Sequence, residues 1–319
     1  MTVLDRDARV YVAGHRGLVG SAVWRRLERE GFQDLVGHSS SELDLRDRDA
    51  TFAAFEADRP DVVVVAAAKV GGIKANMDYP VDYLADNLAI ALNLIAASHK
   101  AKVEKLLMLG STCIYPRLAK QPMSEDQFLT GPFEPTNEWY AVAKTAAIKL
   151  CQAYRTQYGD DYVSVMPTNL YGPGDNYHAV ESHVVAALIR RFHEAKISGV
   201  REVVVWGTGT PKREFLYVDD LADACVFVLK HYSSGDILNI GLGEDLSIAD
   251  FARTVAKVVG YAGTIAFDPS KPDGMPRKLV DVSRLTALGW RARTSLEDGL
   301  RLAYADFLAG GGRNNSIAA

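Results

Sequence analysis

The sequence contains little cysteine and no excess of positive charge. Its 319 residues include three cysteines, at positions 113, 151 and 225, without C-x-x-C spacing. An odd number of widely spaced cysteines argues against a disulfide framework and fits a reducing compartment. The formal net charge is -4. Proteins that bind nucleic acid through its phosphates have a basic excess instead, so we expect no nucleic-acid partner.

Long apolar runs are also missing. The longest, VVVVAAA at 62–68, is far short of the ~20 residues that a membrane-spanning helix needs. The first residues, MTVLDRDARV, are charged and lack the apolar stretch of a signal peptide. The histidines have neither i,i+4 spacing nor a carboxylate cluster beside them, so metal binding has no support. We therefore expect a cytoplasmic protein without a membrane or metal partner.

Short apolar strands and amphipathic helices alternate through the first 170 residues. The strand RVYVAG at 9–14 precedes helical spacing in LVGSAVWRRLEREG at 18–31, and DVVVVAAA at 61–68 is apolar on both faces. Continuous apolar strands separated by helices predict a parallel sheet that is covered on both sides. The expected fold class is α/β, a Rossmann-type doubly wound parallel sheet with a smaller, loop-rich C-terminal domain.

The rhythm of strands and helices then breaks, and glycine and proline become frequent. We expect a nucleotide-binding Rossmann domain over residues 1–171, to which residues 216–240 return. A second domain, built from residues 172–215 and 241–319, would bind the substrate. The glycine-rich tail at 309–319 is expected to be disordered.

The first chemical motif is GHRGLVG at 14–20, a G-x-x-G-x-x-G pattern directly between a strand and a helix. Glycine lets the backbone turn tightly and approach a pyrophosphate, which then faces free N–H groups at the helix N-terminus. A lone glycine triplet can also be a simple tight turn, but the surrounding βαβ rhythm favours dinucleotide binding. The expected cofactor contacts in this motif are Gly14, Arg16, Gly17, Leu18, Val19 and Gly20.

The end of the second predicted strand indicates which dinucleotide binds. It reads LVGHSSSELD, with His38 and three serines before any carboxylate. An acidic residue at this place would hold a ribose 2′-OH and favour NAD, so its absence favours NADP, whose 2′-phosphate Arg16 could reach. A solvated loop and NAD remain the alternatives. The other expected cofactor contacts are His38, Ser39, Ser40, Asp44, Leu45, Ala67, Ala68, Tyr140, Lys144, Pro167, Asn169, Leu170 and His183.

The second motif is Tyr140-x-x-x-Lys144, whose spacing puts both side chains on one helix face. An ammonium group beside a phenol lowers the phenol pKa, so that tyrosine can exchange a proton with a carbonyl oxygen. Alone, the pair could be a tyrosine packed on a lysine stem. It follows a strand-end serine, Ser111, by about 30 residues, and ligands of this fold gather at the carboxyl ends of strands. Ser111, Tyr140 and Lys144 are therefore predicted to be catalytic.

These three motifs together resemble the extended short-chain dehydrogenase/reductases. Longer strings over nearly the whole chain resemble the GDP-L-fucose synthases within that group. The strings are AAAKVGGI at 66–73, LGSTCIYP at 109–116, LAKQPM at 118–123, EPTNEWYAVAK at 134–144, MPTNLYGP at 166–173, WGTGTPKREFLYVDD at 206–220 and SKPDGMPRKL at 270–279. One departure is that the family often has arginines where this chain has HSSS at 38–41.

The resemblance implies 3,5-epimerisation and then NADPH-dependent 4-reduction of GDP-4-keto-6-deoxymannose, with Cys113 and His183 as a base/acid pair. Without the resemblance, the expectation would be that Cys113 is a small buried residue and that His183 is a structural hydrogen-bonding group. Related 4,6-dehydratases have a carboxylate pair after the strand-end serine, whereas this chain has Cys113-Ile114. The cysteine therefore favours epimerisation. Another NAD(P)-dependent nucleotide-sugar 4-reductase or 4-epimerase and a non-catalytic NADP-binding sensor are the alternatives.

A nucleotide-sugar diphosphate needs cationic partners, and an arginine fork can hold phosphate oxygens bidentately. Each cation alone would ordinarily be a surface charge. The expected substrate contacts are Ser111, Cys113, Asn169, Arg191, Trp206, Arg213, Lys271 and Lys278. The resemblance also implies a homodimer that pairs through two helices per subunit, one of them carrying Tyr140 and Lys144.

Overall fold

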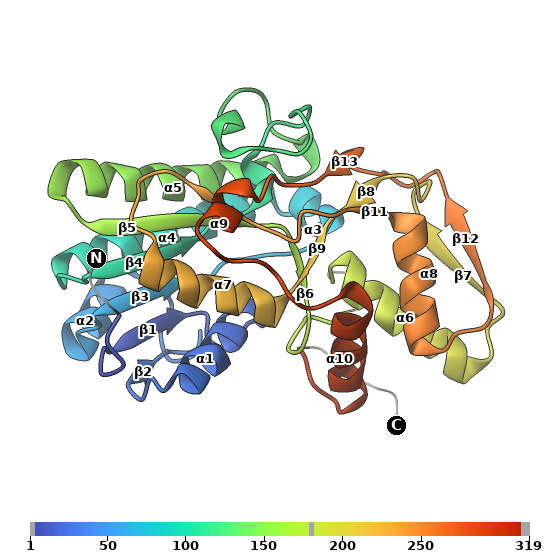
Figure 1. The fold of residues 1–319 in the computed structure, drawn as a ribbon, viewed down its shortest axis with the longest axis horizontal. Coiled ribbons are helices and arrows are strands. Elements are labelled where there is room, and N and C mark those ends of the chain that lie inside the picture. Colours follow the sequence, from blue (N-terminus) through green and yellow to red (C-terminus); the bar gives the residue numbers. More distant parts are fainter. Residues whose placement is uncertain (1–3, 179–181, 314–319) are drawn as a thin grey trace.

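The computed structural model describes residues 4–178 and 182–313 (Figure 1). Its largest sheet has six strands in the spatial order β10-β5-β4-β3-β1-β2, and all neighbouring strands are parallel. The strands are β1 (Val10–Ala13), β2 (Leu35–Val36), β3 (Val62–Val65), β4 (Lys105–Leu109), β5 (Asp161–Pro167) and β10 (Leu238–Ile240). The predicted α/β class with a Rossmann-type parallel sheet is confirmed.

Helices cover both faces of this sheet, which explains why its strands are apolar without alternation. Side chains along a strand point to opposite faces in turn. Val62 and Val64 lie in one buried cluster with α1 and α7, whereas Val63 and Val65 lie in another with α4 and α5. Figure 1 shows α1 and α7 in front of the sheet. The covering helices are α1 (Leu18–Glu30), α2 (Arg48–Asp58), α4 (Pro80–Lys100), α5 (Glu138–Tyr158) and α7 (Val218–His231).

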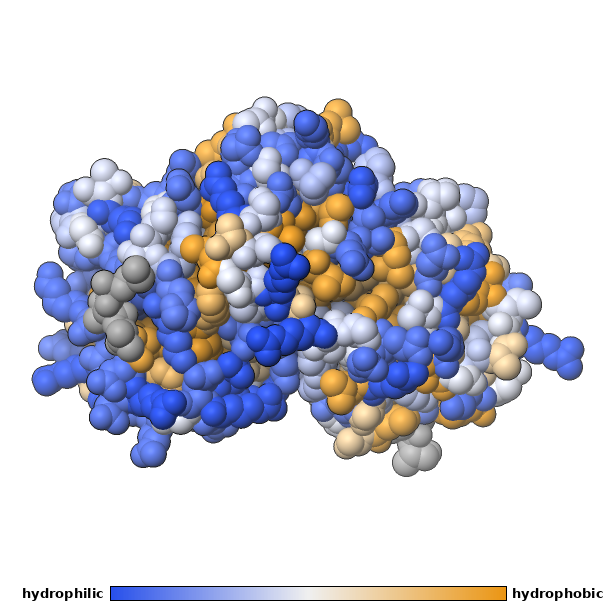
Figure 2. Space-filling view, viewed as in Figure 1, coloured by the Kyte–Doolittle hydropathy of each residue, from blue (hydrophilic) through white to orange (hydrophobic). Residues whose placement is uncertain are grey.

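A second body lies beyond the carboxyl ends of these strands and is built around three helices (Figure 1). The helices α6, α8 and α10 share one hydrophobic cluster with the pair β7 and β12. The elements of this body are β6 (Asn169–Tyr171), α6 (Val184–Ser198), β7 (Glu202–Trp206), β8 (Lys212–Arg213), β9 (Phe215–Tyr217), β11 (Leu246–Ser247), α8 (Ile248–Val259), β12 (Thr264–Asp268), β13 (Arg277–Lys278) and α10 (Leu296–Leu308). Hydrophilic residues dominate the visible outer surface of both bodies, with apolar residues in the hollows between them (Figure 2).

The chain crosses between the two bodies more than once. After β9 it returns to the large sheet, where α7 packs against α1 and β10 pairs with β5. The remaining short elements are α3 (Ile73–Asp78), α9 (Ser283–Ala287) and the 3₁₀ helices at Thr112–Ile114, Glu125–Gln127 and Pro135–Asn137. The division into domains at residue 172, with residues 216–240 returning, stays a prediction.

The glycine-rich tail differs from the expectation of disorder up to residue 313. The Arg313 amide donates a hydrogen bond to the Asp175 carbonyl oxygen at 2.8 Å, and the Tyr177 amide donates to the Arg313 carbonyl oxygen at 2.9 Å. The tail therefore pairs with a loop that lies more than 130 positions earlier in the chain. The expectation for residues 314–319 lies outside the described residues.

The helices α4 and α5, of 21 residues each, are the longest in the described structure. Each carries charged side chains, such as Asp82 and Lys100 on α4 and Lys149 on α5. Across residues 4–178 and 182–313, no helix combines the length and the apolar character needed to cross a membrane. The buried apolar residues of both helices, such as Leu94 on α4 and Ala147 on α5, pack against the sheet.

Candidate active site

One cavity of about 1230 Å³ runs from the glycine-rich loop to the second body, at the carboxyl ends of the strands. Parallel sheets of this type bind ligands at that edge. Of the predicted site residues, all except Gly20 and Lys271 line this cavity. The fold thus brings together residues that are up to 264 positions apart, Gly14 and Lys278 being the extremes.

The glycine-rich loop packs too closely against its own neighbours to accept a side chain at Gly14 or Gly20. Gly14 has a φ of +80°, and a Cβ there would lie 2.9 Å from the Ala67 backbone. A Cβ on Gly20 would lie 2.1 Å from the Gly14 carbonyl oxygen, so Gly20 acts by letting the helix pack closely. Gly17 caps α1 without a side-chain hydrogen bond, and the first turn has no acidic residue. The helix N-terminus therefore offers free N–H groups and fits a pyrophosphate.

Side-chain hydrogen bonds hold the loop that follows β2. The His38 Nε2 lies 2.8 Å from the Asp58 carboxylate. The Ser39 amide and hydroxyl both donate to Glu42, at 2.7 and 2.6 Å. Glu42 did not figure among the expected residues because it lies after the three serines, beyond the strand end. Its carboxylate is held near the side chain of Arg16, whose charge contributes to lowering the pKa of Glu42 after the Ser39 hydrogen bonds.

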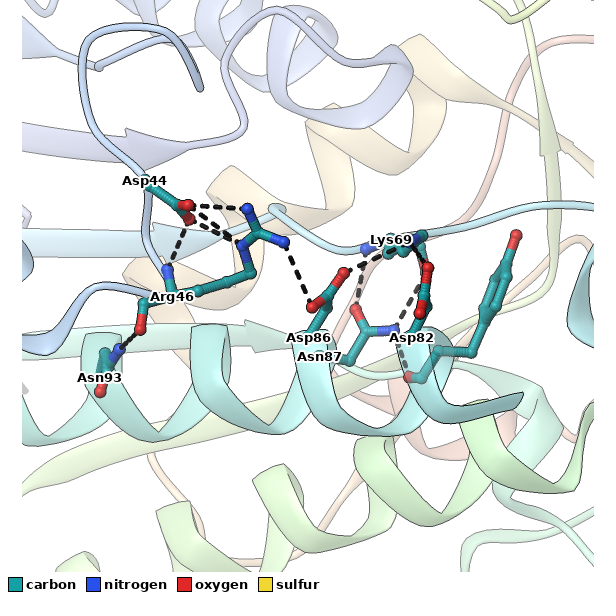
Figure 3. A network of polar contacts seen from close by, with 8 residues as sticks. Asp44, Arg46, Lys69, Asp82, Asp86, Asn87 and Asn93 are labelled. Carbon is teal, nitrogen blue, oxygen red and sulfur yellow. Dashed lines mark hydrogen bonds and ion pairs between the residues drawn. The ribbon is translucent and has the colours of Figure 1, made fainter. Parts of the chain in front are cut away.

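A polar network on α4 fixes the loops at the other rim of the cavity (Figure 3). Arg46 donates to Asp44 at 2.7 Å and reaches Asp86 at 3.4 Å. Lys69 contacts Asp86 at 3.3 Å, and its amide donates to the Asn87 side chain at 2.8 Å. These contacts hold the segments after β2 and β3 against the same helix. Asp44, one of the expected cofactor contacts, is thus already paired with a cation.

Ser111, Tyr140 and Lys144 meet where β4 ends against α5. Ser111 caps the short helix Thr112–Ile114 and accepts a hydrogen bond from the Cys113 amide at 3.2 Å. Lys144 is buried, and its Nζ donates to the Leu109 carbonyl oxygen at 2.8 Å. That Nζ lies 5.7 Å from the centre of the Tyr140 ring. The two side chains therefore share a helix face, as the spacing predicts.

The expected lowering of the Tyr140 pKa by Lys144 is not the dominant effect. Burial raises the pKa of Tyr140, and a hydrogen bond with Ser111 opposes this only in part. Burial also lowers the pKa of Lys144 to about 8. Desolvation disfavours the charged form of each group, since little water reaches this corner. Tyr140 is therefore a neutral phenol, able to donate its proton.

Cys113 is half-buried and faces two nitrogen donors from distant parts of the chain. The Asn137 Nδ2 lies 3.1 Å from the sulfur, and the Lys278 Nζ lies 3.4 Å from it. Lys278 itself is only 8% exposed. Both donors stabilise a thiolate better than a thiol. Asn137 was missed in the sequence, although it directly precedes the helix that carries Tyr140.

His183 lies at the N-terminus of α6 and is exposed to the cavity. The surrounding protein lowers the pKa of His183 by displacing solvent, and the charges of Lys278 and Arg313 lower it further. Lys278 thus acts on both His183 and Cys113. Arg313 also lines the cavity but did not figure among the expected residues, because it lies in the tail.

The remaining predicted substrate contacts lie at the far end of the cavity. Arg213 donates to the Asp273 carbonyl oxygen at 3.1 Å, and burial lowers its pKa. The Trp206 ring is flanked by two cations, with Arg191 at 5.8 Å and Lys271 at 5.5 Å from its centre. Lys271 therefore contacts a lining residue without lining the cavity itself.

Asn169, which was predicted to touch both cofactor and substrate, has an additional structural partner. Its Nδ2 donates to the Glu214 carbonyl oxygen at 2.8 Å. Glu214 is fully buried, and its side chain accepts hydrogen bonds from the amides of Leu242, Gly243 and Val280. Asn169 is thereby tied to the junction between β6 and β9.

The chain matches the model of the NAD dependent epimerase/dehydratase family over residues 10–241. It is 55% identical to GDP-L-fucose synthase 1 of Arabidopsis thaliana, covering 95% of this chain and 94% of that protein. It is 54% identical to GDP-L-fucose synthase of Escherichia coli K12, covering 94% and 96%. A solved GDP-L-fucose synthetase from Naegleria fowleri bound to NADP has a TM-score of 0.90 at 31% identity, covering 97% and 95%. The chain therefore belongs to the NAD dependent epimerase/dehydratase family and, within it, to the GDP-L-fucose synthases.

Proposed function

We propose that this protein converts GDP-4-keto-6-deoxymannose into GDP-L-fucose, by 3,5-epimerisation followed by NADPH-dependent reduction at C4. The observation that carries the proposal is the common cavity in which the Cys113 thiol, His183 and the Ser111-Tyr140-Lys144 group lie. Epimerisation needs a base and an acid, and reduction needs a proton donor beside a hydride donor. The identity to GDP-L-fucose synthases over nearly the whole chain supports the same substrate.

The 4-keto group makes the hydrogens on C3 and C5 acidic, so a modest base can remove them. The thiolate of Cys113 takes the proton from the carbon, and the resulting charge moves to the keto oxygen. Asn137 and Lys278 stabilise the thiolate through their contacts of 3.1 and 3.4 Å. His183 returns a proton to the opposite face of the ring, which inverts the carbon.

The reduction uses the same keto oxygen. NADPH, when bound, supplies the hydride that adds to C4. Tyr140 donates its phenolic proton to the oxygen, and the Ser111 hydroxyl donates a hydrogen bond to it as negative charge develops. Lys144, held by the Leu109 carbonyl oxygen at 2.8 Å, places its amine beneath the Tyr140 ring.

The cofactor is NADP(H), for which the cavity offers a fitting cradle. Gly14, Gly17 and the start of α1 would hold the pyrophosphate, because they line the cavity and no side chain caps the helix there. Arg16, His38 and Ser39 line the part of the cavity after β2 and would receive the 2′-phosphate. The NADP-bound Naegleria fowleri structure supports this choice over NAD.

Exposed apolar residues on α4 and α5 support a homodimer that pairs through these two helices. Val81 and Leu92 on α4, and Tyr158 on α5, are apolar residues with 73%, 47% and 53% exposure.

We further propose a cytoplasmic location, since all three cysteines are free thiols in the structure. We also propose that residues 1–171 and 216–240 form the domain that binds NADP, and that residues 172–215 and 241–319 form the domain that binds the substrate.

The test is incubation of the protein with GDP-4-keto-6-deoxymannose and NADPH in deuterated water. We expect NADPH oxidation and a GDP-L-fucose product that carries deuterium at C3 and C5. Cys113→Ser should lower the deuterium incorporation by about 10²–10⁴-fold, because a hydroxyl is a far weaker base, while NADPH still binds. Reduced product without deuterium would identify a 4-reductase instead, and no NADPH oxidation would exclude the reductase.

A further inference from the structure

The C-terminal residues 306–313, called here the C-terminal strap, are bound to the loop that leads to His183. The Gly174 amide donates to the Asp306 carboxylate at 3.0 Å. The Arg313 amide donates to the Asp175 carbonyl oxygen at 2.8 Å, and the Tyr177 amide to the Arg313 carbonyl oxygen at 2.9 Å. The strap thus adds a short β-type pairing to residues 174–177.

Gly312 makes this close pairing possible. Its φ is +84°, in the left-handed region that favours glycine. A Cβ on Gly312 would lie 2.7 Å from both the Asp175 carbonyl oxygen and the Tyr177 ring. Gly310 also has a positive φ, of +78°, but a Cβ there would meet nothing within 4 Å. Gly312 and Gly310 thus both have a positive φ, but only at Gly312 would a side chain collide with residues 174–177.

The pairing places the side chain of Arg313 on the wall of the active-site cavity. Two cations act on His183, Lys278 from β13 and Arg313 from the strap, and both lower its pKa. Asp175 faces Arg313, and burial raises the pKa of its carboxyl to about 7, an effect that Arg313 opposes.

We propose that the C-terminal strap is a positioning element of the active site, and that it places the Arg313 charge beside His183. The inference rests on the role that the proposed function gives to His183. A cation that acts on His183 makes its protonated form a stronger acid, so that His183 gives up its proton to carbon more readily. Lys278 acts on His183 as well and also contacts the Cys113 sulfur at 3.4 Å, whereas the strap contributes a second cation from a different part of the chain.

The first test is an NMR titration of the histidine side chains in the free protein. The His183 signal is assigned by its loss in a His183→Gln variant. Arg313→Gln should raise the His183 titration midpoint, because a positive neighbour is removed, whereas Arg313→Lys should keep it near that of the original protein. If Arg313→Gln left the midpoint unchanged, the proposed action of Arg313 on His183 would be wrong.

The second test asks whether the strap places that charge. Gly312→Ala should raise the His183 midpoint in the same direction as Arg313→Gln, because the clash with Asp175 and Tyr177 moves Arg313 away. Gly310→Ala carries similar backbone strain and should not. An equal midpoint for Gly312→Ala and Gly310→Ala overturns the strap as a positioning element. Because the titration uses no substrate, it stands apart from whether the proposed reaction takes place.

Discussion

The three cysteines have different surroundings, and we therefore expect them to differ in reactivity. Cys151 and Cys225 are almost completely buried, and burial raises the pKa of each to about 12. Cys113 is half-buried, opens to the cavity, and has the Asn137 and Lys278 nitrogens within 3.4 Å of its sulfur. A thiolate, and not a thiol, attacks an alkylating reagent. Selective labelling should therefore report directly on the proposed base.

We expect iodoacetamide to modify Cys113 in the folded protein while leaving Cys151 and Cys225 unmodified. Mass spectrometry of the peptides measures the extent at each site over time. Lys278→Met should slow the labelling of Cys113 several-fold, because the thiolate loses a cationic neighbour. Lys271→Met is the control, since Lys271 contacts the Trp206 ring instead. Faster labelling of Cys151 than of Cys113 would contradict the assignment.

Lys144 offers a second prediction for a single residue. Its folded-state pKa of about 8 lies below the ordinary 10.5, mainly through burial. The folded protein thus binds this proton less readily than the unfolded chain, and at neutral pH the buried charge lowers stability. Lys144→Met should raise the free energy of unfolding at pH 7 by about 1–3 kcal/mol, the hydrogen bond to Leu109 offsetting part of the gain.

The stabilisation expected for Lys144→Met should depend on pH. Below about pH 8 both states hold the Lys144 proton, so the gain should be constant. It should shrink as the pH rises from about 8 to about 10.5, because the native lysine then loses its proton by itself. Denaturant unfolding at a series of pH values measures it. Lys149→Met, at an exposed position of the same helix, should show no gain, and a destabilised Lys144→Met would refute the explanation.

At the scale of elements, local periodicity was enough to predict the sheet and its helices. The apolar run at Val62–Val65 and the helical spacing at Leu18–Glu30 show which side chains of each segment must be buried. This pattern does not depend on which element covers them. The partners of Cys113 could not be predicted in this way. Asn137 and Lys278 are 24 and 165 positions away from it, and only the packed fold brings them to the sulfur. The contribution of burial to the Tyr140 pKa was missed for the same reason.

The junction of β1 and α1 depends on Gly20, which was predicted to contact the cofactor but does not line the cavity. A Cβ on Gly20 would lie 2.1 Å from the Gly14 carbonyl oxygen. Gly20→Ala should therefore displace the loop and weaken NADPH binding by about tenfold or more, since overpacking typically costs about 1–3 kcal/mol. NADPH fluorescence measures the Kd. Ser21→Ala, at the next position, should bind normally, and an unchanged Kd for Gly20→Ala would contradict this account.

At the scale of the whole molecule, the proposed dimer depends on which apolar residues the fold leaves exposed. Leu92 on α4 is 47% exposed, and Val200, after α6, is 49% exposed. A surface leucine alone needs no partner, but Leu92 lies on the pair of long helices that pack against each other, with Val81 and Tyr158 exposed on the same pair. Val200 lies in the second body, away from these helices.

Leu92→Lys should shift the protein from dimer to monomer in sedimentation analysis, because two copies related by twofold symmetry would each bury the new charge in the same interface. Val200→Lys changes a residue of nearly equal exposure and should leave the dimer intact. A dimer that persists in Leu92→Lys but dissociates in Val200→Lys would move the interface to the second body. A monomer in the unaltered protein would exclude the dimer altogether. The active-site cavity lies within a single chain, so the monomeric variant should still bind NADPH.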